Sequence, residues 1–232
     1  MTSRSERLVA DCATDLTRSA DVRFIREAVD GTLDDDAFAA YLAIEERFVR
    51  TATRVTGYLV WASADWHESA AHARTVGALV GPQLDWFHRV RPRWQGDPDR
   101  IAEAVTRSEP LAAHVLRLVA DHGAPAAVTA MFAAETLYAG WCARAAALPV
   151  ERFSDLRDWI DLHAAASFTE GVRALAAAVD AIPESVDDRT LTAWFRDTLA
   201  AEDAFHDAVH PDAVEPGGLR PDALRPAAQT RP

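Results

Sequence analysis

Ala133-Ala134-Glu135-Thr136-Leu137-Tyr138-Ala139-Gly140-Trp141-Cys142 is the stretch around which the chain is organised. It lies in an apolar segment, residues 125–148, in which only Glu135 and Arg144 carry a charge. This composition predicts a helix near the middle of the fold with Glu135 turned inward. Because residues three and seven positions apart share a helix face, Tyr138 and Cys142 are expected beside Glu135. An ionised carboxylate there is costly without partners, so the stretch predicts polar groups around it.

Helical periodicity continues on both sides of this stretch, and no run alternates apolar and polar residues as a strand does. We therefore predict an all-α fold, a single-domain helical bundle over residues 1–210. Residues 211–232 contain five prolines and predict a disordered tail. Helices are expected over residues 5–18, 22–33, 34–62, 65–80, 82–88, 109–122, 125–148, 154–182 and 187–210. Gly31 is expected as a helix stop, Gly81-Pro82 as the end of one helix and start of the next, and Ser154-Asp155 as the cap of the helix over residues 154–182.

The net charge of −12, with arginine as the only basic residue besides histidine, argues against nucleic acid and anionic membranes as partners. The first residues lack the apolar core of a signal peptide, and no run of about 18 apolar residues predicts a membrane span. Cys12 and Cys142 fall on different expected helices and form no zinc-binding spacing, so neither a disulfide framework nor a zinc site is predicted. We expect a cytoplasmic protein.

An acid followed one turn later by an aromatic residue occurs on three of the expected helices. If the three faces converge, the carboxylates and rings would line a cavity. The pairs are Glu45 with Phe48, Glu135 with Tyr138, and Glu202 with Phe205.

Each of these acids also has a structural explanation. Glu45 has Glu46 and Arg47 as neighbours and fits a solvated helix face equally well. Glu135 could be a core acid paired with an arginine or a hydroxyl group. Glu202 has Asp203 beside it, and spacing alone predicts a surface acid.

His163 follows Trp159 at helical spacing and is expected to point inward, where a hydrogen-bonded core histidine is the simplest interpretation. Asp85 and His88 form a step that helical bundles can use for metal, but one such pair does not predict a metal site. Trp86 is expected to wall one end of the bundle with Trp61 and Trp66. The other histidines are expected at the surface or as filler, at positions 67, 72, 114, 122, 206 and 210.

Motifs of two large enzyme groups do not occur. The chain contains no Gly-rich phosphate loop, no Gly-x-Ser-x-Gly and no His-Glu-x-x-His. Hydrolases of the common serine-triad class and nucleotide enzymes with a Walker loop therefore lose support.

Taken together, these segments resemble the TenA family, also called thiaminase II, whose members have the haem-oxygenase-like helical bundle. Four segments carry the resemblance: residues 24–33 ending in Asp-Gly-Thr-Leu, residues 37–42 followed by Glu45 and Phe48, residues 157–164 with Phe168, and residues 202–207. Better-known members have a nucleophilic cysteine where this chain has Ala134. A second branch carries a glutamate in this helix in a pattern that Glu135, Tyr138 and Trp141 fit in part, so Cys142 is not the family nucleophile.

The resemblance implies a hydrolase of thiamin-breakdown aminopyrimidines, either an aminopyrimidine aminohydrolase or an N-formyl aminopyrimidine deformylase. It implies Glu202 as the principal acid/base and Glu135 as its partner. It implies no cofactor and no metal, a small-molecule pyrimidine substrate, and a homo-oligomer, dimer or tetramer. The expected substrate-binding residues are Glu45, Phe48, Tyr138, His163 and Trp86.

Two alternatives remain at this point. The same bundle supports di-iron oxidases, for which Glu135, Asp85, His88 and His163 could make a partial site. A non-catalytic binding or regulatory TenA-like protein is the other.

Overall fold

The computed structural model describes residues 2–210 and 212, and the regular structure in this part of the chain is entirely helical. The all-α expectation is therefore confirmed. In chain order the elements are α1 (Arg4–Asp11), α2 (Ala13–Ser19), α3 (Arg23–Asp30), α4 (Asp35–Ala62), α5 (Trp66–Ala78), the π-helical turn η1 (Leu79–Gln83), α6 (Leu84–Val90), the 3-10 turn η2 (Arg91–Arg93), α7 (Pro98–His122), α8 (Ala124–Ala147), α9 (Ser154–Ala164), α10 (Ala166–Asp180) and α11 (Asp188–Asp207).

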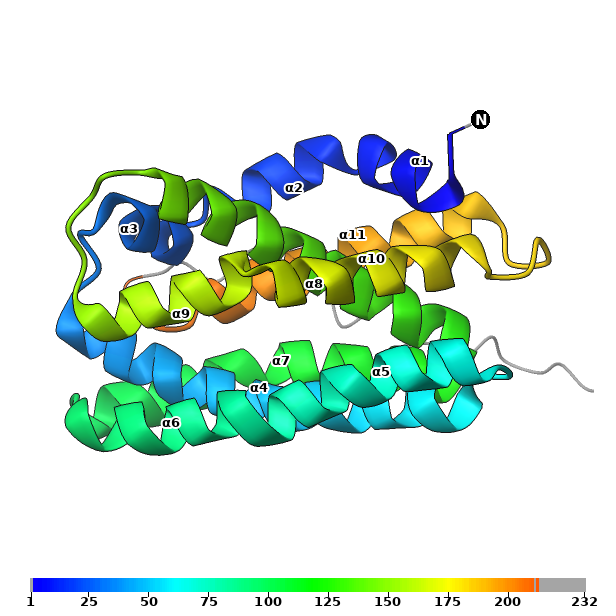
Figure 1. The fold of residues 1–232 in the computed structure, drawn as a ribbon. Helices are drawn as coiled ribbons and strands as arrows, with labels where there is room; N and C mark the ends of the chain where they lie inside the picture. Colours follow the sequence, from blue (N-terminus) through cyan, green and yellow to red (C-terminus); the bar gives the residue numbers. More distant parts are fainter. Residues whose placement is uncertain (1, 211, 213–232) are drawn as a thin grey trace, which may run out of the picture.

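Four long helices, α4, α7, α8 and α11, form the centre of the bundle (Figure 1). Helix α4 packs against α7 and α8, and α11 packs against the same two helices. Helix α5 covers α4, while α9 and α10 cover α8. The inward faces of α4, α8 and α11 therefore meet inside the bundle, which sets the position of Glu45, Glu135 and Glu202.

The sequence places several helix ends correctly. Gly31 ends α3 in the left-handed conformation, with φ of 71°, and a Cβ there would lie 2.5 Å from the carbonyl oxygen of Glu151. Asp34 caps α4 by accepting a hydrogen bond of 2.7 Å from the Ala37 amide. Asp187 caps α11 in the same way.

Two prolines that suggested helix boundaries lie inside helices instead. The expected stop at Gly81-Pro82 is wrong, because a π-helical turn joins α5 to α6 and its wider spacing accommodates the proline. The expected short helix from residue 109 is also wrong at its start, since α7 begins at Pro98 and runs through Pro110. One interior proline removes a single backbone hydrogen bond, and the packing of α7 between α4 and α11 offsets that loss.

Two expected helices are each broken in two. The first divides at Cys12, and the expected helix over residues 154–182 divides at Ala165, whose extended ψ of 153° separates α9 from α10. Neither break has a proline or glycine to signal it. Ser154 is the first residue of α9 rather than its cap, and Asp155 accepts hydrogen bonds from Arg93 and Trp94 instead.

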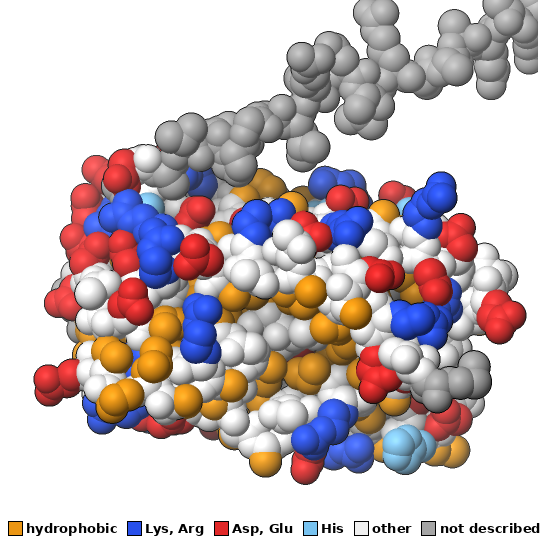
Figure 2. Space-filling model, turned by 90° about the horizontal axis from the view of Figure 1, so that it is seen from above, with side chains coloured by type: hydrophobic (Ala, Val, Ile, Leu, Met, Phe, Trp, Pro, Cys, Tyr) orange, Lys and Arg blue, Asp and Glu red, His pale blue; other side chains and the backbone are white. Residues whose placement is uncertain are grey.

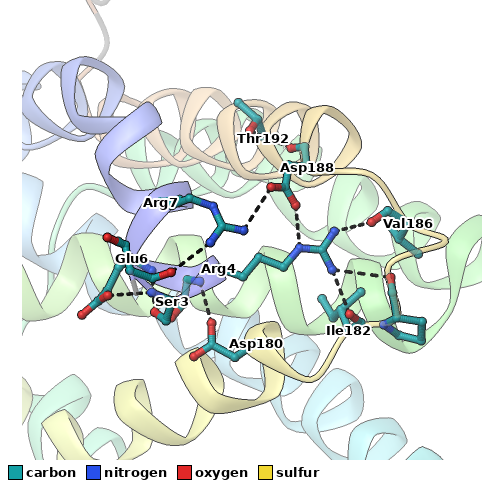
Figure 3. Close-up of polar contacts among 12 residues, drawn as sticks. Ser3, Arg4, Glu6, Arg7, Asp180, Ile182, Val186, Asp188 and Thr192 are labelled. Atoms are coloured by element: carbon teal, nitrogen blue, oxygen red, sulfur yellow. Dashed lines mark hydrogen bonds and ion pairs between the residues drawn. The ribbon is translucent and has the colours of Figure 1, made fainter.

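The N-terminal helix ties down the connection that leads into α11 (Figure 3). Arg4 forms an ion pair of 2.6 Å with Asp188 and donates a hydrogen bond to the Ile182 carbonyl oxygen. Ser5 donates its amide proton to Asp180 at the end of α10. These contacts fix both ends of the loop between α10 and α11 and hence the register of α11.

Arginines of α7 hold the other end of α11. Arg100 donates to the Val209 carbonyl oxygen at 3.1 to 3.2 Å, and Arg107 donates to the His210 carbonyl oxygen at 2.7 Å. Cationic groups at this end of a helix also complement its dipole. The helix that carries Glu202 is therefore fixed at both ends.

The surface carries charges of both signs; Figure 2 shows acidic and basic side chains intermingled on the face seen from above, with hydrophobic side chains toward its middle. Among the described residues, none of the helices has the combined length and hydrophobicity needed to cross a bilayer. The expected tail, residues 211–232, lies outside the described residues apart from Asp212, which pairs with Arg23.

Candidate active site

Three acidic side chains from three central helices lie close together. Glu45 of α4 and Glu202 of α11 are buried, and Glu135 of α8 is partly buried. Burial raises the pKa of Glu45 to about 7, and burial with the charge of Glu45 raises the pKa of Glu135 to about 8. Burial, then the charges of Glu45 and Glu135, hold the pKa of Glu202 well above its usual range. The prediction of a surface acid from the spacing of Glu202 is thus wrong.

Glu202 is fully buried and lacks hydrogen-bond partners within the part of the chain that the structure describes. Neither of its carboxyl oxygens, both buried, has a hydrogen-bond partner among the described residues. His206 Nδ1 lies 3.7 Å from Glu202 Oε2, beyond hydrogen-bond distance. Native proteins rarely leave a buried carboxyl group in this state, and functional sites are where it occurs.

A hydrogen-bonded chain of four fully or largely buried side chains leads to Glu45. Trp159 Nε1 donates to the Tyr41 hydroxyl at 3.1 Å, the Tyr41 and Tyr138 hydroxyls are 2.9 Å apart, and Tyr138 donates to Glu45 Oε2 at 2.8 Å. An indole N–H can only donate. With Tyr138 donating to Glu45, the bond between the phenols uses the Tyr41 proton. In this arrangement every proton of the chain has an acceptor, and the Tyr41 hydroxyl also lies close enough to Glu45 to offset part of the rise in its pKa that burial causes. We call Trp159, Tyr41 and Tyr138 the tyrosine chain.

Two buried histidines border the tyrosine chain. His163 Nδ1 donates to the Trp159 carbonyl oxygen and His206 Nδ1 donates to the Glu202 carbonyl oxygen, each at 2.8 Å. A carbonyl can only accept, so both rings carry their proton on Nδ1 and present Nε2 as an acceptor. Burial lowers the pKa of each to about 4, which keeps both rings neutral at physiological pH.

The expected substrate-binding aromatics occupy different places. The Tyr138 ring lies beside His163 and His206, with centroid distances of 5.3 and 5.5 Å. Trp86 is buried and packs against Trp159 with a centroid distance of 4.8 Å, so it supports the donor end of the tyrosine chain.

Phe48 takes part in a different aromatic contact. It packs on Phe205 of α11 at 5.6 Å, and both rings line a groove of about 380 Å³ between α4 and α7. The other two tryptophans expected to wall the bundle end, Trp61 and Trp66, are exposed at the turn between α4 and α5 instead.

The central helix offers no reactive thiol beside the acids. Ala134 is buried, and Cys142 is a free, buried cysteine. Burial, followed by the charges of Glu45 and Glu135, holds the pKa of Cys142 well above its usual range. A neutral buried thiol is a poor nucleophile.

Sequence reasoning left three residues of this region out of the site. Tyr41 lies one turn before Glu45, Trp159 one turn before His163, and His206 one turn after Glu202. The i to i+4 spacing from a candidate residue was the signal that could have found all three. His206 is also one of three histidines expected at the surface that are buried, the others being His72 and His210.

No group of three or more His, Cys, Asp or Glu side chains within residues 2–210 and 212 is arranged to hold a metal ion. Asp85 and His88 lie on α6, where His88 is exposed.

The sequence profile of the TENA/THI-4/PQQC family matches residues 23–210 of the chain. A sequence comparison of this chain with curated proteins found no match. Among solved structures, a TenA homologue from Pyrococcus furiosus is similar with 18% identity and a TM-score of 0.72, covering 89% of this chain and 100% of that one. A TenA family transcription regulator from Silicibacter sp. TM1040 is similar with 19% identity and a TM-score of 0.74, covering 90% and 97%.

A protein from Sulfolobus solfataricus P2, provisionally described as a TenA-like thiaminase, is similar with 16% identity and a TM-score of 0.68, covering 88% and 94%. At such identities these likenesses establish the fold, and they confirm the expected TenA-like helical bundle. The family profile spans most of the chain, including the three glutamates. The chain therefore belongs to the TENA/THI-4/PQQC family.

Proposed function

We propose that this protein hydrolyses aminopyrimidines derived from thiamin breakdown by carboxyl acid/base catalysis, without a cysteine nucleophile. The observation that carries the proposal is the convergence of Glu45, Glu135 and Glu202, whose pKa values are all raised by burial and, for two of them, by one another's charge. Raised and unequal pKa values allow neighbouring acids to take different protonation states at one pH. Membership of the TenA family supports the substrate class.

Glu45 suits recognition of an aminopyrimidine. The tyrosine chain occupies its Oε2, which leaves Oε1 to accept a hydrogen bond from an exocyclic amine or to share a proton with a ring nitrogen. The ring of Tyr138 and the neutral His163 and His206 provide flat surfaces beside it.

Glu202 and Glu135 suit the two proton transfers of hydrolysis. Glu202, which burial keeps protonated, would give its proton to the nitrogen as the C–N bond breaks. Glu135, in the ionised form that a pKa of about 8 makes available to a fraction of molecules at neutral pH, would take a proton from the water whose oxygen forms the new bond to carbon. The aminomethyl substrate would give an alcohol and ammonia, and the N-formyl substrate would give an amine and formic acid. Transfer of the new proton on Glu135 to Glu202, directly or through a water molecule, would restore the starting state.

The proposal is tested by turnover of 4-amino-5-aminomethyl-2-methylpyrimidine and its N-formyl derivative, with products separated by liquid chromatography. Removing one acid/base group typically costs about 10² to 10⁴ in rate, so Glu202→Gln and Glu135→Gln are each expected to lose that factor. Glu170→Gln, an exposed glutamate of α10, is the matched control. A wild-type protein that neither turns over nor binds either pyrimidine refutes the proposal; binding without turnover would indicate a ligand-sensing protein.

A further inference from the structure

The groove that contains Phe48 is a distinct concave feature with its own charge pattern. It has a volume of about 380 Å³ and lies between α4 and α7, with Arg91 of η2 and Phe205 of α11 completing its lining. Its apolar lining comes from Ile44, Phe48, Val105, Ala112 and Phe205.

Three arginines surround this apolar floor. Arg91 is paired with Glu46 across the groove wall. Arg47 and Arg50 are exposed, lie one turn apart on the same face of α4, and have no ion pair or hydrogen bond to any residue that the structure describes. Glu109 on α7 is the only other carboxylate in the lining, and neither arginine bonds to it.

Two unpaired guanidinium groups beside aromatic rings are unexpected in a chain of net charge −12. Within the described part of the chain many arginines have acidic or carbonyl partners, as Arg4, Arg18 and Arg196 illustrate. Arg47 and Arg50 differ from these three in lining a concave apolar surface. A guanidinium group binds phosphate and carboxylate oxygens with two parallel hydrogen bonds. The groove therefore has the chemistry to hold an anion next to a flat ring.

We propose that this groove binds a small monocyclic aromatic anion, with its phosphate or carboxylate group on Arg47 and Arg50 and its ring over the apolar lining at the accessible edge of Phe48. Glu45 lies one turn before Phe48 and Glu202 one turn before Phe205, so the groove floor adjoins the acid cluster. The inference extends the proposed function by adding an anion subsite, but it can be tested without it.

The test is calorimetric titration of the full chain with four ligands: phenyl phosphate, benzoate, phenol and inorganic phosphate. Phenyl phosphate is expected to bind more tightly than phenol or inorganic phosphate, because it alone combines a dianion with the ring. A charge-assisted hydrogen bond typically accounts for about tenfold in affinity, so Arg47→Gln and Arg50→Gln should each weaken it about tenfold. Raising the salt concentration should weaken it further.

Arg54→Gln is the matched control, since Arg54 is exposed one turn beyond Arg50 on α4 and lies outside the groove lining. Its affinity for phenyl phosphate should equal that of the wild type. The proposal would be overturned if phenyl phosphate and phenol bound with equal affinity. It would also be overturned if Arg50→Gln and Arg54→Gln weakened the affinity for phenyl phosphate by the same factor. Benzoate tests whether the subsite also accepts a carboxylate group. If benzoate binds as tightly as phenyl phosphate, the subsite binds carboxylates as well as phosphates.

Failure of this inference can be distinguished from failure of the proposed function. A protein that turns over neutral aminopyrimidines but binds phenyl phosphate no better than phenol retains the function and loses the subsite. A protein that binds phenyl phosphate through Arg47 and Arg50 but binds no aminopyrimidine retains the subsite and loses the function.

Discussion

Replacing Glu45 with glutamine is expected to change how folding stability depends on pH. Burial raises the pKa of Glu45 from 4.5 to about 7, and the hydrogen bond from Tyr138 offsets only part of this effect. Between these two values the folded protein holds a proton that the unfolded chain has released. The contribution of Glu45 to stability therefore falls as the pH rises through this window.

The size of the effect follows from the difference of about 2.5 pH units between 4.5 and 7. At about 1.4 kcal/mol for each unit, wild-type stability loses about 3 kcal/mol through Glu45 between pH 4.5 and pH 7.5. A glutamine at this position does not titrate, and its side-chain oxygen can still accept from Tyr138. The variant should gain about 3 kcal/mol relative to wild type across the same window.

Urea denaturation followed by tryptophan fluorescence, at intervals from pH 4.5 to pH 7.5, measures this difference. His163 and His206, with pKa values lowered to about 4, raise stability as pH rises toward 6.5, so the quantity to compare is the variant minus the wild type at each pH. The exposed Glu170→Gln variant should run parallel to wild type. Parallel curves for Glu45→Gln and wild type would show that Glu45 ionises normally, and the reasoning about the acid cluster would be refuted.

Three further outcomes are expected. Tyr138→Phe removes the donor to Glu45 and should weaken aminopyrimidine binding about tenfold, measured by calorimetry; unchanged affinity would count against the tyrosine chain. Gly31→Ala should lower the unfolding free energy by more than about 1 kcal/mol, because φ is 71° and a Cβ would approach the Glu151 carbonyl oxygen, whereas Gly57→Ala, with open space around it, should not. Cys142 should resist a thiol reagent in the native protein and react on unfolding; rapid native labelling would contradict its burial.

Much of the fold followed from local patterns. The apolar segment around Glu135 predicted the central helix, and Asp34, Gly31 and Asp187 marked helix ends because their side chains or backbone freedom act within a few residues. The errors at Pro82 and Pro110 have a different origin. In both cases tertiary packing keeps a helix together where local preference favours a break, and a local pattern carries no information about that packing.

The candidate site was less accessible to sequence reasoning. Spacing put Tyr138 on the face of Glu135, but its hydroxyl bonds to Glu45, which lies 93 residues away in the sequence. The acidic neighbour of Glu202 suggested a position in solvent. In the structure α11 directs Glu202 into the bundle, whereas Asp203 lies closer to the surface and forms an ion pair with Arg18. The whole topology decides which helix faces meet, and helical periodicity does not contain this information. The resemblance to a family, rather than periodicity, therefore identified Glu202 as the expected acid/base.

The tyrosine chain gives Glu45 a fixed polarity. It starts at an indole that can only donate and delivers a phenol proton to Oε2. While Tyr138 donates there, a proton that the carboxyl group itself binds sits on Oε1. The same oxygen is then an acceptor at high pH and a donor at low pH, while its partner never changes role. Acidification would thereby invert the hydrogen-bonding pattern that this one atom presents to a ligand, exchanging a preference for amino groups for one for carbonyl groups or unprotonated ring nitrogens.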